Sequence, residues 1–231
     1  MIRSMCFSAT ASFVGAGVIT AAGVATLALV RDVRQLPFAS LPLLFGIHQA
    51  LEGWTWLELG DREGATLSGP GVHMWVMFAW AVLPVLVPWS VWLMEKDPRR
   101  RRLLLAPVVV GGLLGVYMLY LATQSGIGVT VVDHSLDYEL GVPFSSALLA
   151  VPYVFATCVA PAMSSFPFVI AMGVGNFIAM TAAAIMNVSG YSSIWCTFAA
   201  FLSLIVFAHF ANEKYKRAEA GGDVVTVSGP E

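Results

Sequence analysis

Seven long apolar segments run along the chain, separated by short polar or turn-rich stretches. A helix that crosses the hydrocarbon core of a membrane needs roughly 20 mostly apolar residues, and each segment is close to that length or exceeds it. Continuous apolar runs favour helices, because the strands of a membrane barrel alternate apolar and polar residues instead. The predicted helices are approximately residues 7–30, 36–58, 73–94, 103–123, 143–161, 166–188 and 191–212.

The sequence therefore predicts an all-α membrane protein, a seven-transmembrane helix bundle formed by residues 1–212. Composition supports this prediction, because 58% of the 231 residues are hydrophobic and only 11% are charged, whereas a soluble domain is about one quarter charged. Residues 213–231 are polar and contain Gly221 and Gly222, so we expect a flexible cytoplasmic tail. The net charge of −2 and the lack of a basic patch interleaved with aromatic residues give no indication of nucleic-acid binding.

Basic residues predict the orientation. Ten of the twelve Lys and Arg residues fall in the loops after the first and third helices or after the seventh helix, and Arg3 and Arg62 lie on the other side. Because cytoplasmic loops carry the excess of Lys and Arg, we expect the N-terminus outside and the C-terminus in the cytoplasm. The first segment is long for a secretory signal and is followed by Arg31 and Arg34, so we expect it to be retained.

Glu52 is the one acidic residue predicted to lie well inside an apolar segment, and ionisable residues in a bilayer are usually functional because they are costly to bury. His48, Gln49 and Trp56 lie four residues before, three before and four after Glu52, so they share roughly one helical face with it. We predict these three as ligand-binding residues. Four roles for Glu52 remain open: a proton relay with His48, a metal ligand, a group that orients a ligand, and a structural hydrogen bond to His48 or Gln49.

Further candidate groups lie on the same predicted outer side. Cys6 begins the first helix, His73 opens the third, and Cys196 lies near the outer end of the seventh. Thiolate, imidazole and carboxylate ligands suit Zn or Cu, so Cys6, Glu52, His73 and Cys196 form the predicted metal set. A disulfide between Cys6 and Cys196 in an oxidising compartment, or two buried unpaired thiols, are the alternatives.

The connection between residues 124 and 142 is long for a helix–helix loop, and long ordered loops are often functional lids. Asp133 and His134 within it are predicted to cover an outer pocket and contact its ligand, with a solvated surface loop as the alternative. Trp75 and Trp195 are assigned to the aromatic belt at the outer membrane interface.

These features lead to a polytopic membrane protein that binds a metal ion or small ligand in a polar pocket in the outer half of the bundle. A membrane-embedded metal-dependent enzyme is a variant of this prediction, with Glu52 and Cys6 as its catalytic residues. The alternatives are a proton- or ion-coupled transporter or channel that uses His48 and Glu52, and an accessory subunit of a membrane complex. Expected partners are membrane lipid and, for an assembled state, a second copy or another membrane subunit. Retinal is excluded because no predicted span contains the lysine that a Schiff base requires.

Residues 5–12, MCFSATAS, resemble the opening of an uncharacterised bacterial membrane family, and HQALEGWTW (residues 48–56) is also similar to that family. The resemblance implies a multi-pass protein of the bacterial inner membrane. It also implies that Met5 is the translation start, so that Met removal would leave Cys6 as the N-terminal residue. A weaker similarity, in topology only, links the chain to the seven-helix zinc hydrolases related to alkaline ceramidases and adiponectin receptors. Their Ser-x-x-x-His and His-x-x-x-His motifs are not matched here, since Leu44 stands four residues before His48 and the last helix contains only His209.

Overall fold

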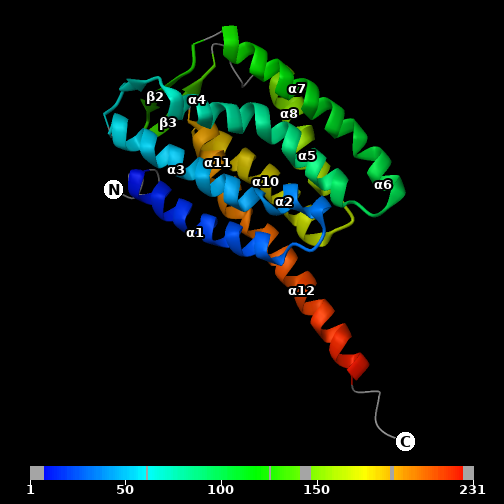
Figure 1. The fold of residues 1–231 in the computed structure, drawn as a ribbon. Helices are drawn as coiled ribbons and strands as arrows, with labels where there is room; N and C mark the ends of the chain where they lie inside the picture. The colour runs from blue at the N-terminus through cyan, green and yellow to red at the C-terminus, as the bar shows by residue number, and fades with distance from the viewer. Residues whose placement is uncertain (1–7, 61, 125, 141–146, 188–189, 226–231) are drawn as a thin grey trace, which may run out of the picture.

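In the computed structural model the chain is mostly helical (80%), and its long helices run side by side (Figure 1). The structure describes residues 8–60, 62–124, 126–140, 147–187 and 190–225. Among these residues, five helical stretches are long and apolar enough to cross a membrane, which indicates a membrane protein. They are Ala9–Leu29, Pro70–Met94, Pro98–Gln124, Pro167–Met186 and Tyr191–Tyr215.

Each of the seven predicted segments contains helical structure among its described residues, and several are divided. The elements in chain order are α1 (Ala9–Leu29), η1 (Val33–Gln35), α2 (Leu36–Ala39), α3 (Leu41–Leu59), α4 (Pro70–Val76), η2 (Met77–Val82), α5 (Leu83–Met94), α6 (Pro98–Leu103), α7 (Leu105–Gln124), α8 (Ala147–Val154), η3 (Phe155–Val159), α9 (Ala160–Ala162), α10 (Pro167–Met186), α11 (Tyr191–Leu202) and α12 (Leu204–Val225). The α2–α3 segment and the shorter apolar stretch Leu148–Ala162 are not among the five, so length and composition alone do not establish seven spans.

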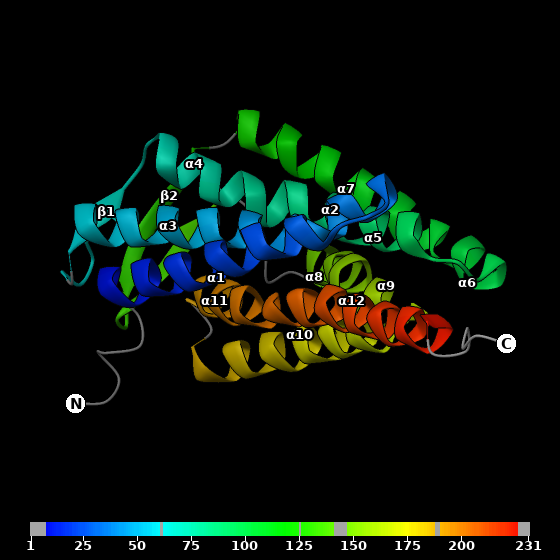
Figure 2. The same ribbon diagram turned by 60° about the horizontal axis from the view of Figure 1, so that its bottom comes forward.

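The last helix continues beyond its predicted end. The sequence predicted a flexible tail from residue 213, whereas α12 extends to Val225. Residues 213–220 read EKYKRAEA, and Ala, Glu, Lys and Arg are strong helix formers, which explains the extension. In Figure 1 this part of α12 projects from the bundle, and Figure 2 shows α11 and α12 lying between α1 and α10.

A small antiparallel sheet covers one end of the bundle, and the all-α prediction missed it. β1 (Thr66–Leu67), β2 (Gly128–Val132) and β3 (Ser135–Glu139) pair in the order β1-β2-β3. Asp133 and His134, with φ of 48° and 58°, form the two-residue turn between β2 and β3. Positive φ at both central residues is the turn geometry that matches the natural twist of a hairpin. The long predicted loop is therefore largely a hairpin.

Glycines let α1 and α3 pack closely in antiparallel directions. A β-carbon on Gly23 would lie 2.4 Å from the backbone nitrogen of Leu43, and one on Gly46 would lie 2.2 Å from Thr20 Oγ1. Small residues at membrane helix contacts allow the backbones to approach. Gly53, further along α3, faces the ring of Phe13 in the same way. The contact therefore continues along most of both helices.

A π-turn interrupts the third helical segment at η2. The amide of Leu83 donates to the carbonyl of Phe78, five residues earlier. In the same register the next amide would donate to Ala79, but the next residue is Pro84, which has no N–H. The hydroxyl of Tyr153, from α8, donates to the Ala79 carbonyl instead. A side chain from another helix thus supplies the hydrogen bond that the proline removes.

A second π-turn, η3, has the same local sequence pattern. The amide of Ala160 donates to Phe155, again five residues earlier, and Pro161 follows. Residues 78–84 and 155–161 both read Phe-Ala-x-x-x-x-Pro. The two π-turns therefore end at the same distance before a proline, and π-turns inside α-helices are frequent at functional sites.

Two glycines bring α7 against the first π-turn. A β-carbon on Gly111 would lie 1.9 Å from the carbonyl oxygen of Pro84, and one on Gly115 would lie 2.7 Å from that of Ala81. Gly111 and Gly115 are four residues apart and so share one face of α7. Gly112, on another face, has no atom near its β-carbon position. The backbone of α7 therefore rests directly on the backbone of the η2–α5 helix.

The connections at the opposite end from the sheet are joined through Glu95. This side chain is buried and accepts hydrogen bonds from the Ser165 amide and hydroxyl, both at 2.7 Å, and from the Ser164 hydroxyl at 3.2 Å. Burial by itself raises the pKa of Glu95, but these bonds and the Asp97 amide hold it below its ordinary value. Arg100 donates to the Ser164 carbonyl at 2.6 Å. The loop before α6 is thereby fixed to the loop before α10.

Gly111→Ala should destabilise the protein by about 1–3 kcal/mol, because the new methyl group overlaps the Pro84 carbonyl and forces α7 away. Gly112→Ala is the matched control, and it should be neutral or stabilising by up to about 1 kcal/mol. Unfolding of both variants in detergent would measure the difference, and equal stabilities would contradict the packing described for α7.

Tyr153→Phe should lower stability by about 1–3 kcal/mol, because it leaves the buried Ala79 carbonyl without the hydroxyl donor. Tyr117→Phe, at an exposed tyrosine of α7, should have little effect. Comparing the two variants by the same unfolding assay tests the assignment, and a neutral Tyr153→Phe would show that the Ala79 carbonyl does not need this donor.

Candidate functional site

Glu52 lies at the meeting point of three helices. Its side chain is 1% exposed, and both carboxyl oxygens accept hydrogen bonds. Trp75 Nε1, from α4, donates to Oε2 at 3.1 Å, and the Ser193 hydroxyl, from α11, donates to Oε1. Residues far apart in the sequence therefore hold a single buried carboxyl group on α3.

His48 reaches Glu52 through Trp75 and makes no direct hydrogen bond to it in the described structure. Its Nε2 donates to the Trp75 carbonyl at 3.2 Å, and its ring stacks on the Trp75 ring with 4.6 Å between centroids. With the proton on Nε2, Nδ1 is the acceptor of a neutral imidazole. This Nδ1 is buried and has no hydrogen-bond partner among the residues that the structure describes. His48 and Glu52 are thus both buried on α3, and they are connected through Trp75 and not by a hydrogen bond to each other.

Gln49 and Trp56 are also buried on the face of Glu52. Gln49 Oε1 and Trp56 Nε1 have no hydrogen-bond partner within the described part of the chain. A buried polar atom without a partner costs about 1–3 kcal/mol. Gln49 points toward α1, where its Nε2 lies 4.0 Å from the position of a β-carbon on Gly15. The face therefore retains hydrogen-bonding capacity that the described residues do not satisfy.

The inner face of the sheet closes this region through Tyr138 of β3. The Tyr138 ring is 3% exposed and stacks on the Trp75 ring, with 3.6 Å between centroids and 1° between planes. Asp133 and His134, predicted to contact a ligand, lie exposed in the hairpin turn. There the Asp133 amide donates to Glu63 Oε1 at 2.9 Å. Within this hairpin, Tyr138 packs against Trp75, whereas Asp133 and His134 lie in the exposed turn.

The sequence contained signals for the residues that were missed. Apolar and polar residues alternate in GVTVV and SLDYEL on both sides of the Asp-His pair, which is a hairpin pattern. The alternation places Tyr138 on the buried face with Val129 and Val131. Trp75 was assigned to the aromatic belt, but it is 0% exposed and belongs to the core. No local pattern distinguishes Ser193 from the neighbouring serine.

Cys196 is the second predicted site residue that the structure brings near Glu52. It lies three residues after Ser193 on α11 and is 4% exposed. Its side chain also lines a cavity of about 30 Å³ together with Thr157 and Asn176, room for about one water molecule. This cavity lies between α11, α10 and η3.

The predicted metal set is not assembled by the described residues. His73 is exposed, and its Nδ1 lies 2.7 Å from the Gly69 carbonyl oxygen. Within the ranges that the structure describes, no three His, Cys, Asp or Glu side chains are placed to hold a metal ion. Cys6 lies outside these ranges. The predicted disulfide between Cys6 and Cys196 therefore also lies outside the described residues. Cys196 and Cys158 are buried and form no disulfide with any described residue.

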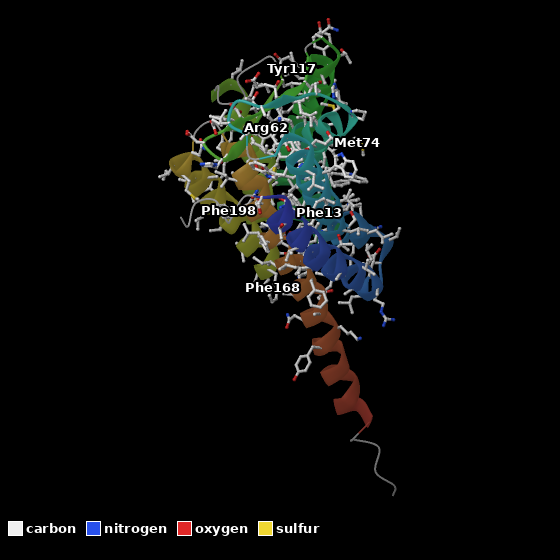
Figure 3. The ribbon with its side chains drawn as sticks, turned by 90° about the vertical axis from the view of Figure 1, so that its left-hand side faces the viewer. Phe13, Arg62, Met74, Tyr117, Phe168 and Phe198 are labelled. Atoms are coloured by element: carbon white, nitrogen blue, oxygen red, sulfur yellow. The ribbon has the colours of Figure 1, made fainter. Side chains whose placement is uncertain are left out.

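His209 lies away from Glu52, at the other end of the bundle. Its ring packs edge-on against Phe38, Phe166 and Phe168 at 5.3–6.4 Å between centroids. Figure 3 shows Phe168 toward this end and Arg62 toward the sheet end. The last helix therefore offers no histidine to the Glu52 region, in agreement with the absent zinc-hydrolase motif.

The hairpin carries a carboxyl group whose ionisation opposes folding. Asp137, on β3 next to Tyr138, is half-buried, and burial followed by the charge of Glu139 raises its pKa from 3.8 to about 6. The folded protein binds this proton more tightly than the unfolded chain does. Stability from this group is therefore greatest below pH 4 and decreases as the pH rises to about 6.

Asp137→Asn should remove this loss and make the protein more stable than wild type at pH 7, by about 1 kcal/mol after solvent screening is allowed for. Thermal unfolding of both proteins between pH 4 and 8 checks the prediction. Other titrating groups affect both curves, so the difference between them isolates Asp137. A difference that does not grow between pH 4 and 6 would contradict it.

Comparison with known proteins identifies a family. Residues 5–220 match the sequence profile of a family of unknown function, DUF6629. No curated protein and no solved structure matches the chain significantly. The comparisons thus offer no support for the similarity to alkaline ceramidases and adiponectin receptors.

Proposed function

We propose that this chain, which belongs to the family of unknown function DUF6629, is a seven-helix bacterial inner-membrane protein that binds a metal ion or comparably small ligand at Glu52. The observation that carries the proposal is the complete burial of Glu52 between donors from two other helices. An ionisable side chain within a membrane bundle is costly to bury and usually marks a functional site.

The packing of α3 supports seven spans. α3 runs antiparallel to α1, so that Gly46 faces Thr20 and Gly53 faces Phe13. Because α1 is long and apolar enough to cross a membrane, a helix in contact with most of its length crosses the same layer. The Leu148–Ala162 stretch is held similarly, since a β-carbon on Gly111 of α7 would lie 3.2 Å from Ala156 Cβ.

The distribution of basic residues supports an outer location for the site. Arg31 and Arg34, the α6 arginines and Lys214 belong to segments at the end of the bundle opposite the sheet. Cytoplasmic loops carry the excess of Lys and Arg. The sheet and Glu52 would then lie on the outer side. The N-terminus would also lie outside, and the C-terminus would lie in the cytoplasm.

The unsatisfied polar atoms around Glu52 favour ligand binding over a purely structural role. His48 Nδ1, Gln49 Oε1 and Trp56 Nε1 are buried donors or acceptors without partners among the described residues. A structural hydrogen bond between helices needs no such surplus, because each unpaired polar atom lowers stability. A small polar ligand would use the groups that the fold leaves open.

A metal ion is the ligand that the available donors suit best. The Glu52 carboxylate and the Cys196 thiol are donor types that bind Zn or Cu, and the described residues bring no third His, Cys, Asp or Glu side chain to them in a metal-binding arrangement. Further donors are needed, and Cys6, which belongs to the predicted metal set, lies outside the described residues. A metal-dependent enzyme is the form of this proposal in which the bound metal activates water beside Glu52.

Purified wild-type protein should contain Zn or Cu in stoichiometric amount, and Glu52→Gln should lose it, because an amide is a poor replacement for an anionic ligand. Cys6→Ser and Cys196→Ser should weaken metal binding at least about tenfold, because even the loss of a residue that only supports a metal ligand costs about that much affinity. Elemental analysis of the four proteins after gel filtration measures the result.

Cys158→Ser is the matched control, because Cys158 is also buried and forms no disulfide with any described residue but bonds to Asn176 rather than facing Glu52. It should keep the metal. The metal proposal would be contradicted by a wild-type protein that neither contains nor takes up Zn or Cu, with unchanged stability in Glu52→Gln.

The small cavity beside Cys196 favours a second candidate function, a proton or ion pathway. Thr157 and Asn176 line this cavity together with Cys196, so polar side chains from η3 and α10 share a cavity with a residue on the helix of Ser193. A pathway predicts pH-dependent flux in proteoliposomes that Glu52→Gln and Asn176→Leu abolish. Absence of both metal and flux, together with a fixed co-purifying subunit, would instead identify an accessory protein.

A further inference from the structure

A groove separates α1 from α12 at the end of the bundle opposite the sheet. α1 ends there at Leu29, and α12 continues outward from the bundle (Figure 1). Two cavities of about 570 and 460 Å³ lie along it and share Leu29 and Lys214 as lining residues. Each is within the size range of ligand pockets, roughly 300–1,000 Å³. We call the two cavities together the α1–α12 groove.

One half of the α1–α12 groove is apolar. Ala25 of α1 and Phe207 and Ala211 of α12 line it. All three belong to helical stretches long and apolar enough to cross a membrane. Ala25 and Phe207 are exposed, so in a membrane this half of the groove faces hydrocarbon.

The other half is polar and carries an excess of positive charge. Arg31, Gln35 and Lys214 line it together with Glu213. Arg31 follows directly after the apolar α1 stretch, and Lys214 lies at the end of the apolar part of α12. The charge of Glu213 also reaches His209 within the bundle. The two cations thus lie at the level where an apolar layer gives way to water.

We propose that the α1–α12 groove binds one anionic phospholipid of the surrounding membrane. The phosphate lies between Arg31 and Lys214, and an acyl chain runs along Ala25, Phe207 and Ala211. The apolar half of the groove lies beside hydrocarbon, and the half with the two cations lies at the membrane surface. This arrangement matches a phospholipid, in which an acyl chain is attached to a phosphate. Basic pockets between helices at the cytoplasmic surface bind anionic headgroups in this way. The site is independent of Glu52.

Native mass spectrometry of protein equilibrated with phosphatidylglycerol and phosphatidylcholine tests the charge requirement. Wild type should retain phosphatidylglycerol preferentially, and Arg31→Gln/Lys214→Gln should reduce that retention roughly tenfold or more. Arg101→Gln/Arg102→Gln is the charge-matched control. It removes two cations of α6, neither of which lines the groove, and it should behave as wild type.

Ala25→Trp tests the acyl-chain half separately, because a large side chain there fills the groove without changing its charge. Ala21→Trp, one turn earlier at an exposed position outside the groove, is its control. Ala25→Trp should lose the lipid and Ala21→Trp should keep it. Thermal unfolding in detergent establishes that each variant is folded before lipid is measured.

Glycerol phosphate distinguishes a lipid site from a site for a free phosphate, because it carries the anion without the chain. It should not displace phosphatidylglycerol at equal concentration. The proposal is overturned by equal retention of the two phospholipids, by displacement with glycerol phosphate, or by lipid loss in the two control variants as large as in the groove variants.

Discussion

A polar group of this chain that lies in the apolar layer is costly unless it finds a partner inside the protein, because hydrocarbon offers none. Threonine hydroxyls meet this constraint locally by donating to carbonyls four residues earlier, as Thr26 and Thr157 do. The Ala79 carbonyl, left free before Pro84, meets it through Tyr153 from another helix. Glu52 meets it through two helices at once. These hydrogen bonds between helices help to fix how the helices are arranged.

The helices could be predicted from the sequence because length and continuous apolarity are properties of single segments. The sheet could not be predicted in the same way, since its strands are short and its β1–β2 pairing joins residues on either side of two helices. The π-turns were missed for a similar reason. A proline marks where a hydrogen bond is lost, but the helix register before it depends on the Tyr153 hydroxyl and on the approach of Gly111.

The candidate site was predicted in part. Glu52, His48 and Cys196 were recognised from residue type and depth, because few side chains in an apolar segment carry such chemistry. Their partners depend on how helices rotate against each other, and that rotation follows from glycine contacts that no local pattern reveals. Trp75 has a hydrogen-bonding and stacking role that its sequence neighbourhood, with other aromatic residues, conceals. Asp133 and His134 were placed on the correct element, but the alternation of the hairpin directs Tyr138 inward instead.

The bond between Ser193 and Glu52 spans 141 residues, and this separation bears on how the protein is made. Synthesis at roughly 5–20 residues per second takes about 7–28 s to cover that distance. During this interval α3 has left the ribosome, whereas α11 does not yet exist. Trp75 emerges much earlier, so the carboxyl group first acquires one donor and only later the second. The nascent chain thus carries an incompletely partnered acid through most of its biogenesis, and synthesis of α11 is the event that supplies its second donor.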